Sequence, residues 1–161
     1  IEDLLDLSRL EQENENISSV EMNLVPFLQG ICKKYDIKIV SESEEFLACI
    51  NPSLFVQAIN NLIENALKYG GKKSEIECVL GNDKSIAIQD KGPGIPPETR
   101  DRIFERFYRI DKGRSRATGG TGLGLSIVRH IVTLHGFSIK ETGRLDGKSG
   151  CRFVIYLDNP S

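Results

Sequence analysis

Three polar side chains, Asn61, Asn65 and Lys68, recur at i, i+4 and i+7 in the sequence. Within a helix this spacing puts them in one row on a single face. An amide carbonyl is a hard oxygen ligand of the kind that Mg²⁺ accepts, and a lysine one turn further along can neutralise phosphate oxygens. The row therefore predicts a site for a metal-bound phosphate group, and the alternative is an ordinary solvated helix edge.

Asp90 stands where an apolar strand pattern meets the glycine-rich turn Gly92-Pro-Gly94-Ile95. A carboxylate buried there must find hydrogen-bond donors or shift its pKa. Adenine offers an exocyclic amine where guanine has a carbonyl, so an ionised Asp90 would accept from ATP and repel GTP. The two glycines let the backbone approach a flat ring, on which Ile95 can pack. The alternative is structural, because aspartates at turns commonly accept hydrogen bonds from following amides such as that of Gly92.

A glycine-dense loop over residues 118–124 runs directly into a helical pattern. Such a loop presents free amides and the positive end of the helix dipole, which favours phosphate; the alternative is a flexible hinge. The loop is neither a dinucleotide fingerprint nor a Walker loop, because it lacks the third glycine at the required spacing and the Gly-Lys-Ser/Thr ending. The residues predicted to contact phosphate are Gly120, Thr121, Gly122, Leu123, Gly124 and Leu125.

A helix must position the polar row, and Asn51-Pro52 is a typical helix start because the asparagine can cap the first amides. Apolar residues then recur in pairs every four positions as far as Tyr69, where two glycines end the helix. The alternating pattern over 75–89 predicts an antiparallel hairpin with one buried face that leads to Asp90. Further helices are predicted over 22–35 and 123–135, short helical turns over 98–107, a polar basic lid over 108–122, and strands over 37–40, 46–50, 137–142 and 152–157.

Composition indicates one globular domain, since 39% of the 161 residues are hydrophobic and 27% are charged. The net charge of −2 gives no support to a nucleic-acid or membrane surface, but residues 100–130 hold 8 basic and only 3 acidic side chains. A local basic segment in a nearly neutral protein favours a compact anionic ligand. The positive charge of the lid comes from Arg106 just before it and from Arg109, Lys112, Arg114 and Arg116 within it; one of these is expected near a γ-phosphate, and most are expected to serve solubility.

The remaining candidates for chemistry predict less. Four widely separated cysteines indicate reduced, mostly buried thiols of a cytosolic domain. His130 and His135 lie on a helical pattern without a second ligand at metal spacing, and we interpret them as ordinary helix histidines. No membrane span or signal peptide is visible, and a chain that opens on Ile1 within a charged helical pattern is expected to be part of a longer protein.

These motifs, in this order, resemble the catalytic and ATP-binding domain of sensor histidine kinases, within the ATPase superfamily that also holds gyrase B, HSP90 and MutL. Asn61-Leu-Ile-Glu-Asn65-Ala-Leu-Lys68-Tyr69 resembles the family's asparagine box, and Asp90-Lys-Gly92-Pro-Gly94-Ile95 its first glycine box. The segment 104–109 resembles the phenylalanine box, and 120–125 the second glycine box. Residues 5–11 are similar to the end of the second dimerisation helix, so 1–16 would be helix end and linker, 17–158 the catalytic domain and 159–161 a tail.

The resemblance implies a two-layer α/β sandwich with a mixed, mainly antiparallel sheet, helices packed on one face, and ATP under a flexible lid on the other. It implies that Asn65 holds Mg²⁺, that Asn61 helps at the metal or phosphates, and that Lys68 and Tyr69 meet phosphate and ribose or base. Asp90 would recognise adenine, and Arg109 would contact the γ-phosphate during transfer. Two departures from the family pattern are Asn51 in place of an aspartate, and Cys151 where a serine or threonine often supports the base.

The resemblance further implies transfer of the γ-phosphate of ATP to a histidine on a dimerisation domain that lies before Ile1, followed by relay to a response regulator. The full-length protein would be a homodimer and this chain alone a monomer. The domain would be cytoplasmic, either in a soluble protein or in a membrane-anchored bacterial sensor, with no nucleic-acid partner. Hydrolysing relatives carry a glutamate where this chain has Asn61, and an amide cannot serve as a base for water. The alternatives are a stand-alone ATPase or serine-directed kinase of the same superfamily, and a nucleotide-binding module without transfer.

Overall fold

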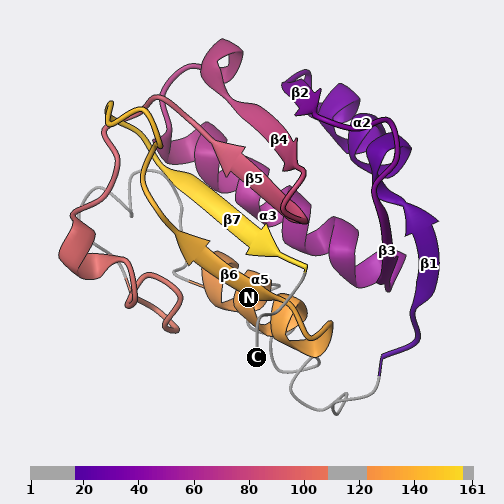
Figure 1. Ribbon diagram of the computed structural model, residues 1–161. Helices are drawn as coiled ribbons and strands as arrows, with labels where there is room; N and C mark the ends of the chain where they lie inside the picture. Colours follow the sequence, from indigo (N-terminus) through magenta and orange to yellow (C-terminus); the bar gives the residue numbers. More distant parts are fainter. Residues whose placement is uncertain (1–16, 109–122, 158–161) are drawn as a thin grey trace.

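The computed structural model describes residues 17–108 and 123–157, which form a sheet with helices packed on one face (Figure 1). The chain begins with β1 (Val20–Asn23), α2 (Leu24–Tyr35), β2 (Lys38–Ser41) and β3 (Leu47–Ile50), followed by the long helix α3 (Pro52–Tyr69) and a 3₁₀ turn, η1 (Lys73–Glu75). The second half comprises β4 (Glu77–Gly81), β5 (Ser85–Gln89), the 3₁₀ turn η2 (Pro97–Thr99), α5 (Gly124–Leu134), β6 (Ser138–Glu141) and β7 (Arg152–Tyr156).

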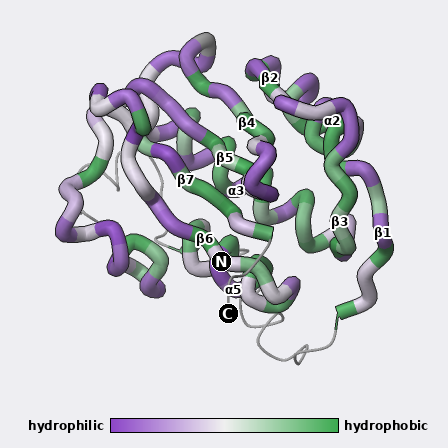
Figure 2. Tube along the Cα trace, viewed as in Figure 1, coloured by the Kyte–Doolittle hydropathy of each residue, from purple (hydrophilic) through white to green (hydrophobic). Residues whose placement is uncertain are grey.

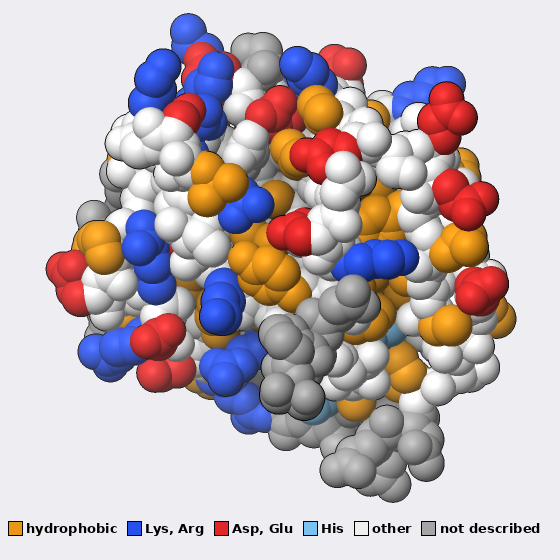
Figure 3. Space-filling model, in the orientation of Figure 1, with side chains coloured by type: hydrophobic (Ala, Val, Ile, Leu, Met, Phe, Trp, Pro, Cys, Tyr) orange, Lys and Arg blue, Asp and Glu red, His pale blue; other side chains and the backbone are white. Residues whose placement is uncertain are grey.

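The main sheet has five strands in the order β2-β4-β5-β7-β6, and β1 and β3 form a separate antiparallel pair. Only the β2–β4 pairing is parallel, so the sheet is mixed and mainly antiparallel, as predicted. Helix α3 lies between α2 and α5 behind the sheet (Figure 1). The opposite face of the sheet carries acidic and basic side chains close together (Figure 3).

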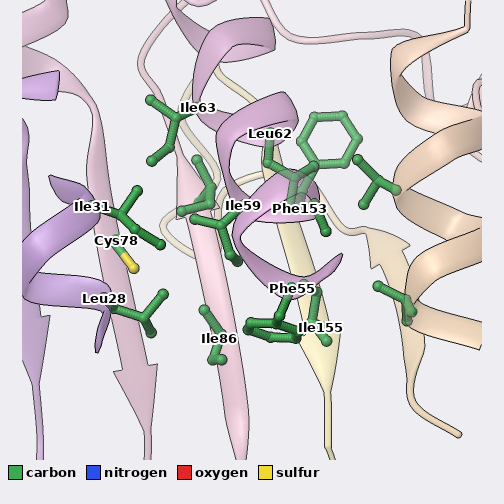
Figure 4. Close-up of a cluster of buried hydrophobic side chains, with 14 of the residues drawn as sticks. Leu28, Ile31, Phe55, Ile59, Leu62, Ile63, Cys78, Ile86, Phe153 and Ile155 are labelled. Carbon is green, nitrogen blue, oxygen red and sulfur yellow. The ribbon is translucent and has the colours of Figure 1, made fainter. Parts of the chain in front are cut away.

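The core forms where α3 meets the central strands. Phe55, Ile59 and Leu62 of α3 are fully buried, and Figure 4 shows them beside Ile86 of β5 and Ile155 of β7. Burying each such side chain stabilises the fold by roughly 1.5–3 kcal/mol relative to exposure. Figure 2 shows the same division along the chain, with hydrophobic residues in the central strands and hydrophilic residues in the connecting loops. Asn51 caps α3 as predicted, because its side-chain oxygen accepts from the amide of Leu54 at 3.1 Å.

Most element boundaries differ by one or two residues from the sequence prediction, and for two of them the structure shows the cause. The helix predicted from residue 22 begins at Leu24, because Met22 pairs with Ala48 in the β1–β3 ladder. Asn23 then caps the helix, and its side-chain oxygen accepts from the amides of Val25 (3.1 Å) and Phe46 (2.9 Å). Likewise β4 begins at Glu77 rather than at residue 75, because η1 occupies the preceding positions.

The hairpin of β4 and β5 pairs antiparallel as predicted, but β5 is buried on both faces rather than one. Ala87 points away from the helices and is still 1% exposed, because it lies between the larger side chains of Val79 and Val154 in the ladder. All four cysteines are free; Cys32 and Cys78 are buried as predicted, whereas Cys49 is exposed. Residues 1–16, the lid beyond Tyr108 and residues 159–161 lie outside the described part. Among the described helices, none combines the length and the hydrophobicity needed to cross a membrane.

Candidate functional site

Helix α3 presents the predicted polar row beside its buried stripe. Asn61 and Asn65 are half-buried and Lys68 is exposed, next to the buried Leu62 and Ala66. Within the described residues none of the three polar side chains has a hydrogen-bond partner, so their amide oxygens and the ammonium group remain available to a ligand. Hard amide oxygens of this kind fit Mg²⁺ when phosphate and water supply the other ligands. No group of three His, Cys, Asp or Glu in the described chain could hold a metal ion by itself.

Asp90 is 3% exposed at the end of β5, and its two carboxylate oxygens differ in their surroundings. Oδ1 accepts from the amide of Gly92 at 2.9 Å and from that of Cys151 at 3.1 Å. The structural alternative raised by the sequence is therefore confirmed for this oxygen. Oδ2 has no hydrogen-bond donor among the described residues and faces Gly70 at the end of α3. One oxygen fixes the turn, and the other is free for an external donor.

Burial raises the pKa of the Asp90 carboxyl above its ordinary value, and the nearby Glu141 adds to that rise. The amide hydrogen bonds from Cys151 and Gly92, together with the Arg144 cation, lower the pKa without offsetting the burial. Because Oδ2 lacks a donor, the ionised form is incompletely stabilised. A ligand that donates a hydrogen bond to Oδ2 would stabilise it and lower the pKa.

Close backbone packing brings Asp90 against α3. A Cβ atom at Gly70 would lie 2.5 Å from Cγ of Asp90, and one at Gly92 would lie 2.7 Å from Cα of Gly70. Both positions therefore need glycine for steric reasons. Gly94, with a φ of 73°, adopts the backbone conformation that favours glycine. It packs against Gly150, which lies in the loop just before β7. Ile95 follows at the edge of the core, half-buried.

The groups brought together by this packing lie in the helical layer. Asn61, Asn65 and Lys68 belong to α3, and the Asp90 side chain turns toward the end of the same helix. The residues predicted to bind ATP therefore lie in the helical layer, not on the face of the sheet opposite the helices to which the resemblance assigned ATP. The physical reason is that the edge of α3, rather than the far face of the sheet, is where polar side chains remain uncovered beside a buried stripe.

Part of the predicted phosphate loop lies at the start of α5. Leu123 is buried and occupies the N-cap without a side-chain acceptor for the first amides of the helix. A Cβ at Gly124 would meet no atom within 4 Å, so the described residues do not crowd this position of the first helical turn. The backbone N–H groups of Gly124 and Leu125, in the first turn of α5, have no acceptor within the helix and can donate to an anion. Arg109, Gly120, Thr121 and Gly122 lie outside the described residues, and Tyr69 is exposed at the end of α3.

The short helical turns predicted over 98–107 are present and are anchored to the sheet. Phe104 is buried against Phe153 of β7, with ring centroids 6.1 Å apart at 83°. The Arg100 guanidinium lies 2.8 Å from the buried carboxylate of Glu141 at the end of β6. Phe107, in contrast, is 58% exposed with a φ of 61°. This segment is therefore held to the sheet by Phe104 and Arg100, and the exposed Phe107 lies directly before the predicted lid.

Several residues of the site were missed by the sequence analysis. Gly70 was predicted only to end a helix, although it makes room for Asp90, and Gly150 was not singled out. Arg144 donates from Nη1 to the backbone carbonyl of Asp90 at 3.2 Å, and Ser149 donates to the carbonyl of Gly92 at 2.6 Å. These residues lie 54 and 57 positions away from their partners, and no local pattern marks them.

Comparison with known proteins gives consistent matches. Residues 50–161 match the profile of the family described as histidine kinase-, DNA gyrase B-, and HSP90-like ATPase. Hybrid signal transduction histidine kinase D of Dictyostelium discoideum is 38% identical over 98% of this chain and 11% of its own length. The sensor protein kinase WalK of Staphylococcus haemolyticus is 38% identical over 84% of this chain and 24% of its own length. The chain thus spans a quarter or less of these two relatives.

The fold is also shared with a solved structure. The crystal structure of full-length ShkA in complex with AMPPNP superposes with a TM-score of 0.71 at 23% identity. The match covers 95% of this chain and 34% of that one. The shared architecture includes the mainly antiparallel sheet and the helices packed on it.

Proposed function

Because the chain belongs to the histidine kinase-, DNA gyrase B- and HSP90-like ATPase family, we propose that it is the ATP-binding kinase domain of a sensor histidine kinase. In this proposal it transfers the γ-phosphate of ATP to a histidine on a dimerisation domain. The observation that carries the proposal is the pairing of a buried Asp90, whose Oδ2 is free, with an unpartnered amide row on α3. One end of that arrangement suits adenine and the other suits the phosphates.

The adenine end takes its selectivity from Asp90. Its Oδ2 accepts a hydrogen bond from the exocyclic amine of adenine and repels the carbonyl of guanine. Gly92 and Gly94 let the ring approach the backbone, and Ile95 packs against it. Tyr69, exposed at the end of α3, contacts ribose or base.

The phosphate end is built on two helices. Asn65 holds Mg²⁺, with Asn61 beside it at the metal or the phosphates, and Lys68 neutralises phosphate oxygens. The bound Mg²⁺ supplies positive charge that offsets the charge of the triphosphate. Backbone N–H groups at the start of α5 donate hydrogen bonds to further phosphate oxygens, and Arg109 acts on the γ-phosphate. The residues assigned to this phosphate contact are Gly120, Thr121, Gly122, Leu123, Gly124 and Leu125.

The amide of Asn61 supports phosphate transfer over hydrolysis. An amide cannot remove a proton from water, so this position offers no general base for ATP hydrolysis. In this proposal the acceptor histidine belongs to a second domain, the dimerisation domain. We place the kinase domain, residues 17–158, in a homodimeric cytoplasmic assembly that passes the phosphate to a response regulator, with this chain alone a monomer.

The experiment that tests the proposal supplies this chain with ATP labelled at the γ-phosphate and a separate helical hairpin bearing the histidine. Label on the hairpin, lost when its histidine is replaced by alanine, is the expected result. Asn65→Ala in the kinase domain serves as the inactive control. Free labelled phosphate without transfer would favour a stand-alone ATPase, and nucleotide binding without either product would favour a binding module; both outcomes would overturn the proposal.

A further inference from the structure

The loop between β6 and β7, residues 142–151, holds the Asp90 turn through several contacts. Arg144 donates to the backbone carbonyl of Asp90 at 3.2 Å, and the hydroxyl of Ser149 donates to the carbonyl of Gly92 at 2.6 Å. The amide of Cys151 donates to Oδ1 of Asp90 at 3.1 Å. From these contacts we propose that Arg144 is a positioning residue for nucleotide selectivity, which fixes the direction in which Asp90 presents its free oxygen to the adenine amine. This inference rests on the proposed function.

Arg144 is itself fixed in place. Its Nε and Nη2 donate to the two carboxylate oxygens of Asp146, at 3.1 and 2.6 Å, in a bidentate arrangement. The Arg144 side chain is only 11% exposed, whereas Leu145 next to it is 79% exposed. A planar guanidinium with two donors committed to Asp146 has little freedom, so its third donor, Nη1, is aimed at the Asp90 carbonyl. A lysine, with a single flexible ammonium, cannot reproduce this geometry.

The contacts leave Asp90 little room to rotate. Its backbone N–H donates to the carbonyl of Cys151 at 3.0 Å, while Arg144 holds its carbonyl from the other direction. With the backbone held on both sides and Oδ1 bound to two amides, the position of Oδ2 is determined. The loop approaches closely because Gly150 has no side chain: a Cβ there would lie 2.1 Å from the Asp90 carbonyl oxygen and 2.8 Å from Cδ of Arg144.

Arg144 also acts on the charge of Asp90. Its cation lowers the pKa of the Asp90 carboxyl, against the burial and the nearby Glu141 that raise it. An ionised Asp90 accepts from adenine and repels the guanine carbonyl, so both the position and the charge of this residue determine the preference for ATP. Loss of Arg144 should therefore weaken ATP binding more than GTP binding.

The test measures ATP and GTP affinity by calorimetry on this chain and on Arg144→Gln, Arg144→Lys and Asp146→Asn. Lys148→Gln is the matched control, because Lys148 lies in the same loop, is exposed and carries the same charge. We expect Arg144→Gln to weaken ATP binding about tenfold, or about 1.4 kcal/mol, with a smaller loss for GTP. Arg144→Lys and Asp146→Asn should fall in between, and Lys148→Gln should match the wild type.

A second readout separates positioning from a general structural role. Without the Arg144 cation, the acid limit of ATP binding should move to higher pH, because a larger share of Asp90 is then protonated. Thermal unfolding of each variant shows whether the fold is intact, and if Arg144→Gln does not fold, Asp146→Asn carries the same test. Equal weakening of ATP and GTP, or unchanged ATP affinity in folded Arg144→Gln and Asp146→Asn, would overturn the inference alone. A wild-type chain that binds no ATP would overturn the proposed function instead.

Discussion

The two ends of helix α3 are built differently. At the N-terminal end every polar group of Asn51 has a partner: its side-chain oxygen accepts from Leu54, its Nδ2 donates to Ser18 at 2.8 Å, and its backbone N–H donates to Nε2 of His135 at 3.0 Å. Around this cap the rings of Phe55, His135 and Phe137 pack together, with Phe55 and Phe137 at 89° and 6.3 Å. Asn51 therefore has no polar group left for a ligand.

At the C-terminal end some polar side chains have no partner among the described residues. Asn65 and Lys68 have no partner among the described residues, and Asp90 keeps an oxygen free next to Gly70. Burial acts on the titratable group at each end but with different consequences near neutral pH. It lowers the pKa of His135 and so favours the neutral form that the cap uses, whereas it raises the pKa of Asp90 and so opposes the ionised form. The paired groups at the N-terminal end stabilise the fold. The unpaired groups at the C-terminal end stabilise it less, and we assign them to ligand binding.

Of the substitutions that test this difference between the two ends of α3, Asp90→Asn should have the largest effect. The amide oxygen of asparagine can still accept from Gly92 and Cys151, so the turn should persist. The side chain loses its charge, and its NH₂ group would face the adenine amine. We expect ATP affinity, measured by calorimetry, to fall by at least about 100-fold, since a hydrogen bond to a charged group is worth about 1.5–3 kcal/mol and a mismatch adds to its loss.

The same variant should leave the free energy of unfolding unchanged or slightly higher. Because the pKa of Asp90 is raised in the folded state, the folded protein binds more protons than the unfolded chain between the ordinary value of 3.8 and the folded value. Stability therefore falls as pH rises through that window, and asparagine removes this loss. Asp101→Asn, at an exposed position, is the control for both measurements. ATP affinity equal to wild type in Asp90→Asn would contradict the assignment of this end to binding.

Gly70→Ala tests whether ATP binding at the C-terminal end of α3 depends on the close packing of Gly70 against Asp90. The added methyl would lie 2.5 Å from Cγ of Asp90 and 2.6 Å from the carbonyl oxygen of Ala66, so the backbone or the Asp90 side chain must move. We expect about 1–3 kcal/mol of lost stability in urea unfolding, together with weaker ATP binding. Gly30→Ala, in the middle of α2 with no atom within 4 Å of the new methyl, should instead stabilise the protein by about 0.5–1 kcal/mol. Equal stabilisation by both substitutions would refute the steric argument.

The sequence predicted the helix and its polar row well because both depend on local signals. The Asn51-Pro52 start, the paired apolar positions and the row of Asn61, Asn65 and Lys68 all lie within one element of 18 residues. The two alternatives for Asp90 were also visible from the sequence: the hydrogen bonds to Oδ1 confirm the structural one, and the recognition of adenine by Oδ2 stays a prediction.

Contacts between distant segments could not be predicted in this way. His135 was interpreted as an ordinary helix histidine, yet it accepts from an amide 84 residues away. The same limit applies to Arg144, whose partner is 54 residues away, and to Glu141, which accepts from Arg100. The start of α2 was misplaced because pairing between β1 and β3 overrides the helical pattern at Met22. In each case the tertiary fold, rather than the local sequence, selects the interaction.

Asn51→Ala probes the end assigned to stability. Removing the side chain eliminates the hydrogen bond to Leu54 and the one to Ser18, and such cap losses destabilise a protein by about 1 kcal/mol. ATP affinity of the folded variant should stay within twofold of wild type, since the site is at the other end of the helix. Asn51→Asp should retain most of the stability, because aspartate caps a helix as well as asparagine. Loss of ATP affinity without loss of stability would reverse the roles assigned to the two ends.

The smallest expected effect is the pH response of His135. Its Nδ1–H donates to the carbonyl of Ile131 at 2.8 Å and its Nε2 accepts from Asn51, so the ring must be neutral in this tautomer. Burial lowers its pKa below the ordinary value of 6.5, and the hydrogen bond to Ile131 offsets only part of that shift. Between the folded pKa and 6.5 the unfolded chain binds a proton that the folded protein does not. This histidine therefore makes stability fall as the pH drops below 6.5, with no further loss below the folded pKa.

His135→Phe isolates this contribution, because phenylalanine keeps a ring against Phe55 and Phe137 but cannot titrate. The variant should be less stable at neutral pH by about 1 kcal/mol, because the amide of Asn51 loses its acceptor. Its stability should then decline less steeply than that of the wild type when urea unfolding is repeated at acid pH. If the free energy of unfolding depends on pH equally in His135→Phe and in the wild type, the Asn51 cap tolerates a charged imidazole. The difference in titration between the two ends of α3 would then rest on Asp90 alone.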